Sequence, residues 1–461
     1  MKLYNTLTRR QEEIEFKNNS INMYICGVTP YSSSHLGHAM STVVFDVLRR
    51  YLEFKGFQVN HIQNFTDVDD KMIKAASDTG VSTSELADKN IESFLNEMDL
   101  LNNLRANEYP RATKEIDKII EIISNLISKN LAYYTKDGVY FRVDKVKDYG
   151  KLSKRSLADM ISGSRVEIDH NKENPMDFAL WKSKKPGEPY WNSPWGDGRP
   201  GWHIECTAMS IKYLGNTIDI HGGGQDLIFP HHENEIVQSE GYTNEIPFSK
   251  FWIHNGLLRM GDDKMSKSVG NIVLIQDVLS KFSSNAIRIF VLSSHYRSPL
   301  DYSEDNIRSK ENSMKKLYKV LDYSGGIYDN KVQDIYDARE SQFICAMNED
   351  LNTPRAIASI FDLTKDLSQL INEGIDITDG QILLNKLTDI LGIDLTNKKK
   401  ESKDDLYLDS LMDILMDIRS KLRNKKEFEL ADQIRSNLYD LGINLEDSSK
   451  TTDWNIFEKT E

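Results

Sequence analysis

Residues 22–38 have the sequence Asn-Met-Tyr-Ile-Cys-Gly-Val-Thr-Pro-Tyr-Ser-Ser-Ser-His-Leu-Gly-His and decide the fold. The first five residues are typical of a short buried strand, and the following stretch rich in serine is typical of a turn. Apolar residues then recur at helical spacing from Leu36 to Leu52, the helix should end at Gly56, and residues 58–64 again fit a strand. This order predicts a right-handed βαβ unit, which binds ligands at the carboxyl ends of its parallel strands.

The length of the chain indicates several domains, because 461 residues at roughly 150 per domain exceed one hydrophobic core. We expect an α/β fold in which a Rossmann-type parallel sheet, interrupted by an insertion, precedes a helical bundle and a small C-terminal domain. The expected boundaries are 1–112 and 199–260 for the two halves of the sheet domain, 113–198 for the insertion, 261–305 for a lysine-rich loop and the region after it, 306–400 for the bundle and 401–461 for the C-terminal domain.

The composition excludes several classes of protein. The net charge of −13 argues against coating of nucleic acid by bulk charge, although a local basic face stays possible. Three cysteines cannot build a disulfide framework, so metal binding or burial is expected for them. No apolar run approaches the roughly 18 residues of a membrane span, and the amino terminus has no apolar signal segment. We expect a cytoplasmic monomer without membrane contact.

The turn between the first strand and the first helix is a candidate phosphate site. Backbone amides and the positive end of the helix dipole would face an anion there. His35 and His38 are three residues apart, so both imidazoles can point to one phosphate, and Gly37 lets a flat group approach the backbone. The alternative is a pair of exposed histidines at a helix start.

A second candidate phosphate site is the loop around Lys264-Met-Ser-Lys-Ser268. Lys264, Ser266 and Lys267 form a clamp suited to a phosphate chain that gains charge as it leaves. The alternative is a solvated charged turn. It is weakened because this loop and the first turn both follow strands and favour the same kind of ligand.

A run of three glycines, Gly222 to Gly224, ends another predicted strand and precedes Asp226. Glycine allows a planar base or a ribose to rest directly on the backbone. A flexible loop explains the same run equally well.

Cysteine, histidine and glutamate residues at separate places in the chain form a candidate metal site. His231 and Glu235 share a helix face if their segment is helical, and His232 is then expected to point elsewhere. With the thiolates of Cys26 and Cys206 they would make a four-coordinate zinc site. Burial as ordinary core residues is the alternative for each of them.

Six motifs in one order resemble the cysteinyl-tRNA synthetases, a family of class I aminoacyl-tRNA synthetases, and the likeness runs from Leu3 nearly to the end of the chain. The motifs are Cys26 with His35-Leu-Gly-His38, Asn64-Phe-Thr-Asp-Val-Asp-Asp70, Gly201-Trp-His-Ile-Glu-Cys206, His221-Gly-Gly-Gly, Phe229-Pro-His-His-Glu-Asn-Glu235 and Lys264-Met-Ser-Lys-Ser268.

The resemblance implies a two-step reaction. ATP and L-cysteine give a cysteinyl adenylate, and the terminal ribose of the cysteine tRNA then takes the amino acid, with Mg²⁺ accompanying ATP. The residues implied in catalysis are His35, His38, Lys264 and Lys267. The residues implied in ATP binding are Gly37, Gly222, Gly223, Asp226, Ser266 and Lys267.

The resemblance also implies how cysteine is selected. One Zn²⁺ per chain is held by the positions matching Cys26, Cys206, His231 and Glu235, and the sulfur of the substrate coordinates it. Zinc prefers a soft thiolate to a hydroxyl, so it rejects serine, which a pocket cannot do well by shape. The positions that match the amino-acid pocket are Gly27, Thr66, Trp202 and His221.

The chain departs from the commonest family pattern in its first turn, Cys-Gly-Val-Thr-Pro-Tyr, and at Met40, where arginine is frequent. The same turn occurs in a related enzyme that joins cysteine to an amino sugar in mycothiol synthesis, which is the first alternative. That relative lacks the C-terminal anticodon domain, whereas this chain resembles that domain at Arg435, Asp447 and Trp454, the candidate tRNA contacts. A catalytically silent tRNA-binding relative is the second alternative. A basic cluster that could follow the tRNA stem contains Arg419, Lys421, Arg423, Lys425 and Lys426.

Overall fold

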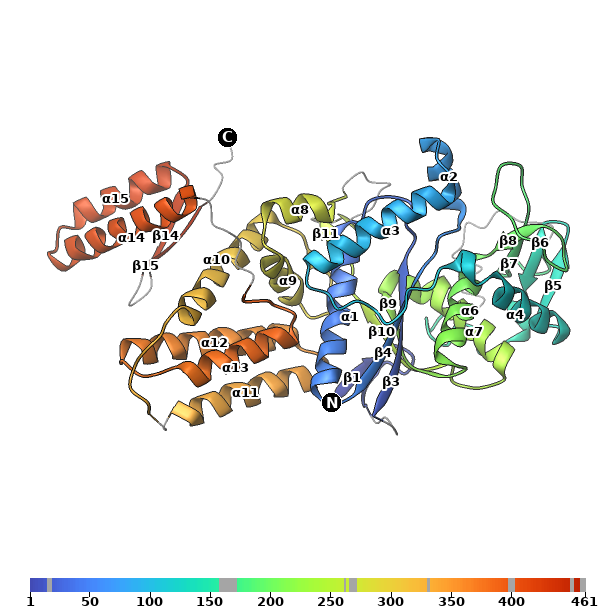
Figure 1. Ribbon diagram of the computed structural model, residues 1–461, viewed down its shortest axis with the longest axis horizontal. Helices are drawn as coiled ribbons and strands as arrows, with labels where there is room; N and C mark the ends of the chain where they lie inside the picture. Colours follow the sequence, from blue (N-terminus) through green and yellow to red (C-terminus); the bar gives the residue numbers. More distant parts are fainter. Residues whose placement is uncertain are drawn as a thin grey trace.

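The computed structural model describes residues 1–14, 19–156, 172–260, 263–264, 272–329, 332–396, 403–447 and 452–456. Its centre is a sheet of four parallel strands in the order β10-β9-β3-β4 (Figure 1). Their bounds are β3 (Ser20–Val28), β4 (Gln58–Phe65), β9 (Ile218–Gly224) and β10 (Ser249–Asn255). The chain winds outward in both directions from the middle pair β3 and β9, so their carboxyl ends flank the crevice where such sheets bind ligands. The predicted parallel βαβ unit is confirmed.

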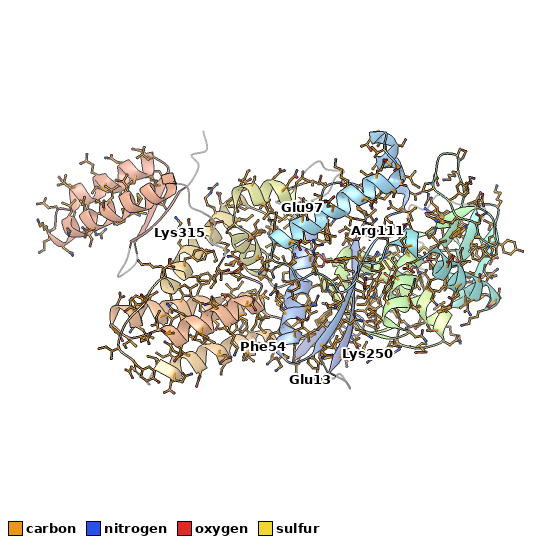
Figure 2. The ribbon with its side chains drawn as sticks, in the orientation of Figure 1. Glu13, Phe54, Glu97, Arg111, Lys250 and Lys315 are labelled. Carbon is orange, nitrogen blue, oxygen red and sulfur yellow. The ribbon has the colours of Figure 1, made fainter. Side chains whose placement is uncertain are left out.

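Helices cover both faces of this sheet. α1 (Leu36–Phe54) packs on one face, and α6 (Trp202–Leu214) and α7 (Glu233–Thr243) pack on the other. Both faces of strand β4 are apolar, so both must be covered. Val59 and Phe65 belong to the apolar core on the α1 side, and Ile62 belongs to the core on the α6 side. Side chains fill the space between the sheet and the helices (Figure 2).

The insertion forms a second sheet of four antiparallel strands in the order β5-β6-β7-β8. Their bounds are β5 (Ala132–Thr135), β6 (Gly138–Phe141), β7 (Phe178–Ser183) and β8 (Gly198–Pro200). Further helices and 3₁₀ turns follow β4 in the chain and precede β9. They are α2 (Asp70–Thr79), α3 (Thr83–Leu100), η1 (Ala112–Lys114), α4 (Ile116–Ser128) and η2 (Val143–Lys145).

The chain after the parallel sheet is mainly helical, as predicted. A small sheet of β11 (Leu258–Met260), β12 (Asp263–Lys264) and β13 (Leu300–Asp301) accompanies α8 (Ile275–Lys281) and α9 (Ser284–Leu292). The bundle contains α10 (Glu304–Leu321), α11 (Gln333–Asn348), α12 (Thr353–Asn372) and α13 (Thr378–Ile390). The amino-terminal hairpin is β1 (Lys2–Asn5) and β2 (Arg10–Glu13).

The C-terminal segment has two helices, α14 (Lys403–Asn424) and α15 (Phe428–Asp440). An antiparallel hairpin that was not predicted follows them, with strands β14 (Ile443–Asp447) and β15 (Thr452–Ile456). Among the described residues, no helix is both long and apolar enough to cross a membrane.

A buried arginine joins the bundle to the sheet domain. Arg288 on α9 is 0% exposed, and its guanidinium donates to Asp46 Oδ2 on α1 at 2.6 Å. It also donates to the backbone oxygens of Leu101 after α3 at 2.9 Å and of Leu391 after α13 at 3.0 Å. One side chain therefore fixes four segments against each other.

Candidate metal centre and active site

Two thiols, an imidazole and a carboxylate converge at the crevice of the parallel sheet. Cys26 lies near the carboxyl end of β3, Cys206 on α6, and His231 and Glu235 on the segment that leads into α7. Cys26 Sγ lies 3.8 Å from Cys206 Sγ and 3.5 Å from Glu235 Oε1, and His231 Nε2 lies 3.0 Å from Glu235 Oε1. All four ligand atoms lie within 4.8 Å of one another, so the structure brings the predicted set together.

These separations suit a tetrahedral zinc centre. Zn–S bonds of about 2.3 Å place two sulfur ligands about 3.8 Å apart, and this is the Cys26–Cys206 distance of 3.8 Å. The hydrogen bond that Cys26 donates lowers the pKa of Cys206, which favours the thiolate, the form of cysteine that binds metal.

The prediction for His232 is wrong, because its side chain turns toward the cluster. Its Nε2 lies 3.3 Å from Cys26 Sγ, and a second possible ligand group contains Cys26, His221, His232 and Glu235. The chain enters α7 through a π-type turn, η4 (Ile228–His232), in which Phe229 has extended backbone (φ −139°, ψ 131°). α-Helical spacing therefore holds for His231 and Glu235 but not for His232.

Further histidines around the cluster were missed in the sequence. The Nδ1 of His231 lies 2.9 Å from Nδ1 of His203, and the Nδ1 of His232 lies 2.8 Å from Nε2 of His254. A hydrogen bond at the second ring nitrogen of a metal-binding histidine fixes the orientation of its ring. His203 lies within the quoted motif at 201–206, but His254 lies on β10 and only the fold brings it near.

The residues expected to contact cysteine surround the same cluster. Trp202 stacks on His231 with ring centroids 4.3 Å apart and is 40% exposed, whereas His221 and Thr66 are buried. Gly27 donates its backbone N–H to Asn64 Oδ1 at 2.9 Å. A Cβ at Gly27 would lie 1.6 Å from the Asn64 carbonyl oxygen, so only glycine fits between β3 and β4.

The two histidines of the first turn lie together at the start of α1. His35 caps the helix, its backbone N–H donates to His38 Nδ1 at 3.3 Å, and the two rings stack with centroids 3.7 Å apart. Gly37 is in the first turn of the helix. The juxtaposition predicted from their spacing is confirmed.

The glycine run ends β9, and the 3₁₀ turn η3 (Gln225–Leu227) follows it. The sequence suggested that glycine is needed there for a ligand, but contacts within the protein also require it. A Cβ at Gly222 would lie 2.4 Å from the Phe45 ring of α1, and one at Gly223 would lie 2.9 Å from Leu227. A Cβ at Gly224 would lie 2.6 Å from Asp226 Oδ1. Packing within the protein already excludes side chains along this run.

The structure describes only some of the predicted residues in the lysine loop and the C-terminal domain. Lys264 ends the short strand β12, and Ser266 and Lys267 lie outside the described residues. Arg435 on α15 donates to the Leu445 oxygen at 3.1 Å. Trp454 of β15 lies opposite Leu445, and Asp447 lies opposite Thr452. In the basic cluster, Arg419 is 1% exposed and so cannot belong to an outer basic face, which corrects that expectation.

Comparison with known proteins agrees with this geometry. The family described as tRNA synthetases class I (C) catalytic domain matches residues 12–312, and the DALR domain family matches residues 342–396. A cysteine–tRNA ligase of Dehalococcoides mccartyi is 51% identical over 99% of this chain and 100% of its own length. The chain belongs to the cysteine–tRNA ligase family. A cysteine–tRNA ligase of Thermotoga maritima is 42% identical over 99% of this chain and 100% of its own length.

The fold of this chain is similar to that of a solved aminoacyl-tRNA synthetase structure. Methionyl-tRNA synthetase of Mycobacterium tuberculosis in complex with methionyl-adenylate has a TM-score of 0.58 and covers 82% of this chain, with 88% of its own chain matched. At 15% identity this likeness shows the fold alone. The match to cysteine–tRNA ligases over their whole length does not favour the amino-sugar ligase.

Proposed function

We propose that this chain joins L-cysteine to the 3′ end of cysteine tRNA in two steps, with Zn²⁺ selecting the thiol. The observation that carries the proposal is the convergence of Cys26, Cys206, His231 and Glu235 at the crevice between β3 and β9. His35, His38 and the glycine run flank the same crevice, so an activated amino acid and its nucleotide can meet there.

The donor set fits zinc by residue type and by separation. Cys26, Cys206, His231 and Glu235 would hold the ion, while His203 and the π-type turn fix the imidazole. When bound, Zn²⁺ would act as a Lewis acid of borderline softness, which prefers thiolate to hydroxyl and lowers the pKa of a thiol. Trp202, Thr66, His221 and Gly27 would bound the space for the rest of the amino acid.

In the first step, a carboxylate oxygen of cysteine bonds to the α-phosphorus of ATP, the bond from that phosphorus to the oxygen bridging to the β-phosphorus breaks, and pyrophosphate leaves. Mg²⁺ would accompany the phosphates of ATP and offset part of their charge. His35, His38, Lys264 and Lys267 would stabilise the charge that develops on the phosphates. Gly37, Gly222, Gly223, Asp226 and Ser266 are the further proposed ATP contacts.

In the second step, a ribose hydroxyl oxygen of the tRNA bonds to the adenylate carbonyl carbon. The bond from that carbon to the phosphate oxygen breaks, and AMP leaves with the hydroxyl proton. The chain needs no nucleophile of its own for either step, so positioning and charge stabilisation account for the rate.

Each domain of the chain has its own role in the proposed function. Residues 1–112 and 199–260 would form the catalytic domain, 113–198 its connective insertion, 261–305 the lysine loop and stem-contact region, 306–400 the bundle and 401–461 the anticodon-binding domain. Arg435, Asp447 and Trp454 are the proposed anticodon contacts, and the protein would act as a monomer.

Exchange of pyrophosphate into ATP tests the first step, and charging of cysteine tRNA tests the second. Exchange should depend on cysteine and be negligible with serine. The Lys267→Ala variant should lose exchange activity while it still binds cysteine. Exchange that is equally fast with serine would refute thiol selection, and absence of tRNA charging would refute the acceptor.

A further inference from the structure

A buried carboxylate, that of Asp350, lies where the helical bundle meets the sheet domain. Asp350 stands in the turn between α11 and α12 and is 1% exposed. α11 ends beside the amino-terminal hairpin, where Glu349 pairs with Lys2 (Figure 1). A buried charge is tolerated only where hydrogen bonds and opposite charge surround it. The partners of Asp350 therefore show what this carboxylate holds together.

Donors from two other parts of the chain converge on Asp350. Its Oδ1 accepts from the Tyr4 backbone N–H of β1 at 2.8 Å and from the Tyr296 hydroxyl at 2.8 Å. Its Oδ2 accepts from Arg297 Nε at 2.9 Å and from Arg297 Nη2 at 2.7 Å. Hydrogen bonds between charged groups are roughly twice as strong as those between neutral groups. One carboxylate thus ties the segment after α9 to the bundle and to the amino-terminal hairpin.

The backbone of this turn is held in a conformation that its own residues disfavour. Asp350 has φ 56° and Leu351 has φ 50°, and left-handed backbone is costly for residues other than glycine. Contacts on both sides hold the turn. The Asp350 N–H donates to the Lys2 oxygen at 3.0 Å, and the Thr353 hydroxyl donates to the Leu292 oxygen at 2.8 Å. The place of the carboxylate is therefore imposed by the surrounding fold.

The segment that Asp350 holds supports the strands that lead into the lysine loop. The Tyr296 oxygen accepts from the Gly256 N–H at 2.7 Å, and a Cβ at Gly256 would lie 2.2 Å from the Ser298 oxygen. Directly after these contacts, β13 pairs with β11, and β11 pairs with β12, which ends in Lys264. A continuous path of hydrogen bonds and short backbone links thus joins Asp350 to the backbone of Lys264.

We propose that Asp350 is a positioning residue for adenylate formation, because it fixes the segment from Tyr296 to Ser298 on which the strand with Lys264 is built. The inference rests on the proposed function, in which Lys264 stabilises charge on the phosphates of ATP. A misplacement of about 1 Å that originates far from the reacting atoms can slow a reaction on the order of 100-fold. The four proposed metal ligands lie on other elements, so loss of the carboxylate should slow the first step and leave zinc and cysteine binding unchanged.

The Asp350→Asn variant tests this assignment against the Asp366→Asn variant. Asp366 on α12 accepts from Arg339 at 2.7 Å, so the control removes the same charge from another aspartate–arginine pair of the bundle. Cysteine-dependent exchange of pyrophosphate into ATP gives kcat and both KM values, and the zinc content of each protein is measured alongside. We expect kcat of Asp350→Asn to fall at least about tenfold, with the KM for cysteine within about twofold and zinc content unchanged. The control should keep kcat within about twofold of the wild type.

The Tyr296→Phe variant gives a second readout, because it removes one hydrogen bond to Asp350 and keeps the ring. Its kcat should fall on the order of threefold. Combining it with Asp350→Asn should cause no further loss, because both changes act through one carboxylate.

Three results would overturn the assignment: wild-type kcat in Asp350→Asn, multiplied losses in the double variant, or a kcat that falls only in proportion to zinc content, as an unfolded fraction would produce. If Asp350→Asn does not fold, a wild-type kcat in Tyr296→Phe overturns it alone. Failure of the proposed function would differ, because the wild-type protein itself would then show no cysteine-dependent exchange.

Discussion

The thiol of Cys206 illustrates how much of the chemistry depends on one atom. It is 1% exposed and faces Cys26, so a hydroxyl in its place would still fit but would offer zinc a hard ligand. Cys345, on the exposed surface of α11, is a matched cysteine that lies outside the metal cluster.

The Cys206→Ser variant should lose most of its zinc and its preference for cysteine over serine, because one of two sulfur ligands is gone. The Cys345→Ser variant should keep about one zinc per chain. Metal analysis of both purified proteins after dialysis checks this. Full zinc content in the Cys206→Ser protein would exclude this residue from the ligand set.

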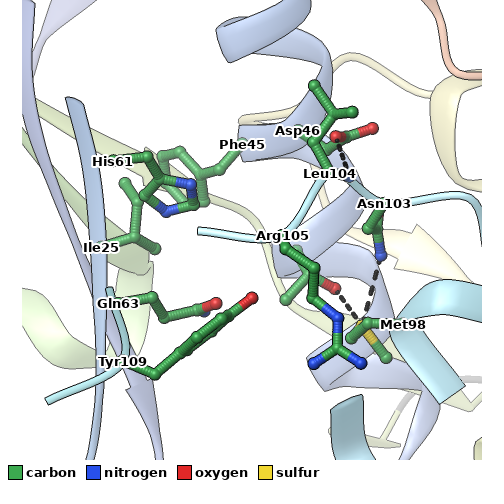
Figure 3. Close-up of a pocket in the computed structure, with 11 residues that line it drawn as sticks. Ile25, Phe45, Asp46, His61, Gln63, Met98, Asn103, Leu104, Arg105 and Tyr109 are labelled. Atoms are coloured by element: carbon green, nitrogen blue, oxygen red, sulfur yellow. Dashed lines mark hydrogen bonds between the residues drawn. The ribbon is translucent and has the colours of Figure 1, made fainter. Parts of the chain in front are cut away.

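His61 on β4 is a buried histidine outside the metal cluster. Neither of its ring nitrogens has a hydrogen-bond partner among the described residues, and it lines a cavity of about 20 Å³, roughly the room for one water molecule (Figure 3). Burial, followed by the nearby Arg49 charge, lowers the pKa of His61 from its ordinary 6.5 to about 3. The native protein therefore keeps His61 neutral at pH 5, whereas the unfolded chain protonates it.

Stability contributed by neutral His61 is complete above pH 6.5 and is lost as the pH falls from 6.5 toward 3. Between pH 7 and pH 5 this loss amounts to about 2 kcal/mol in the free energy of unfolding. The His61→Gln variant should lack that part of the loss. Denaturant titrations of both proteins at the two pH values measure it, and an equal loss in both would show that His61 is protonated in the native state.

Residue types and spacing could predict the ligand set, since His231 and Glu235 share a helix face. The same reasoning failed for His232, because a π-type turn precedes the helix. It could not find His254, because only the parallel pairing of β9 and β10 brings that strand to the cluster.

At the scale of elements, the packing of strand β9 against helix α1 depends on the contact between Gly222 and Phe45. Gly222 leaves room for the Phe45 ring, and a Cβ there would lie 2.4 Å from a ring carbon. The sequence indicates that glycine matters at position 222, but it does not identify Phe45 as the contact. No sequence pattern links residues so far apart along the chain. The packing of α1, which carries His35 and His38 at its start, thus depends on the strand that ends in the glycine run.

The Gly222→Ala variant should lose about 1–3 kcal/mol in the free energy of unfolding, the usual cost of overpacking a core. In the Gly222→Ala/Phe45→Leu double variant, the smaller side chain should recover part of that loss. A double-mutant cycle from denaturant titrations measures the coupling. Strictly additive losses would show that the two residues do not compete for space.

At the scale of the whole molecule, the sequence predicts the order of sheet, insertion and bundle because each has a long, regular pattern. It does not predict the junction at Arg288, whose partners Asp46, Leu101 and Leu391 are far apart along the chain. The C-terminal hairpin was missed because its two strands are only five residues each and largely polar.

The Arg288→Met variant should lose about 3–5 kcal/mol in the free energy of unfolding, because Asp46 stays buried with fewer partners. The Arg339→Met variant removes a more exposed arginine that pairs with Asp366 at 2.7 Å, and should cost less than about 1 kcal/mol. Denaturant titration compares the two variants. Similar losses in both would show that the buried junction adds little.

X-ray absorption at the zinc K edge, recorded without substrate and then with L-cysteine or L-serine, tests the metal centre most directly. We predict about one zinc per chain with two sulfur neighbours at about 2.3 Å, a third sulfur when cysteine is added, and no change with serine. A protein without zinc, or a sulfur count that does not respond to cysteine, would contradict the account.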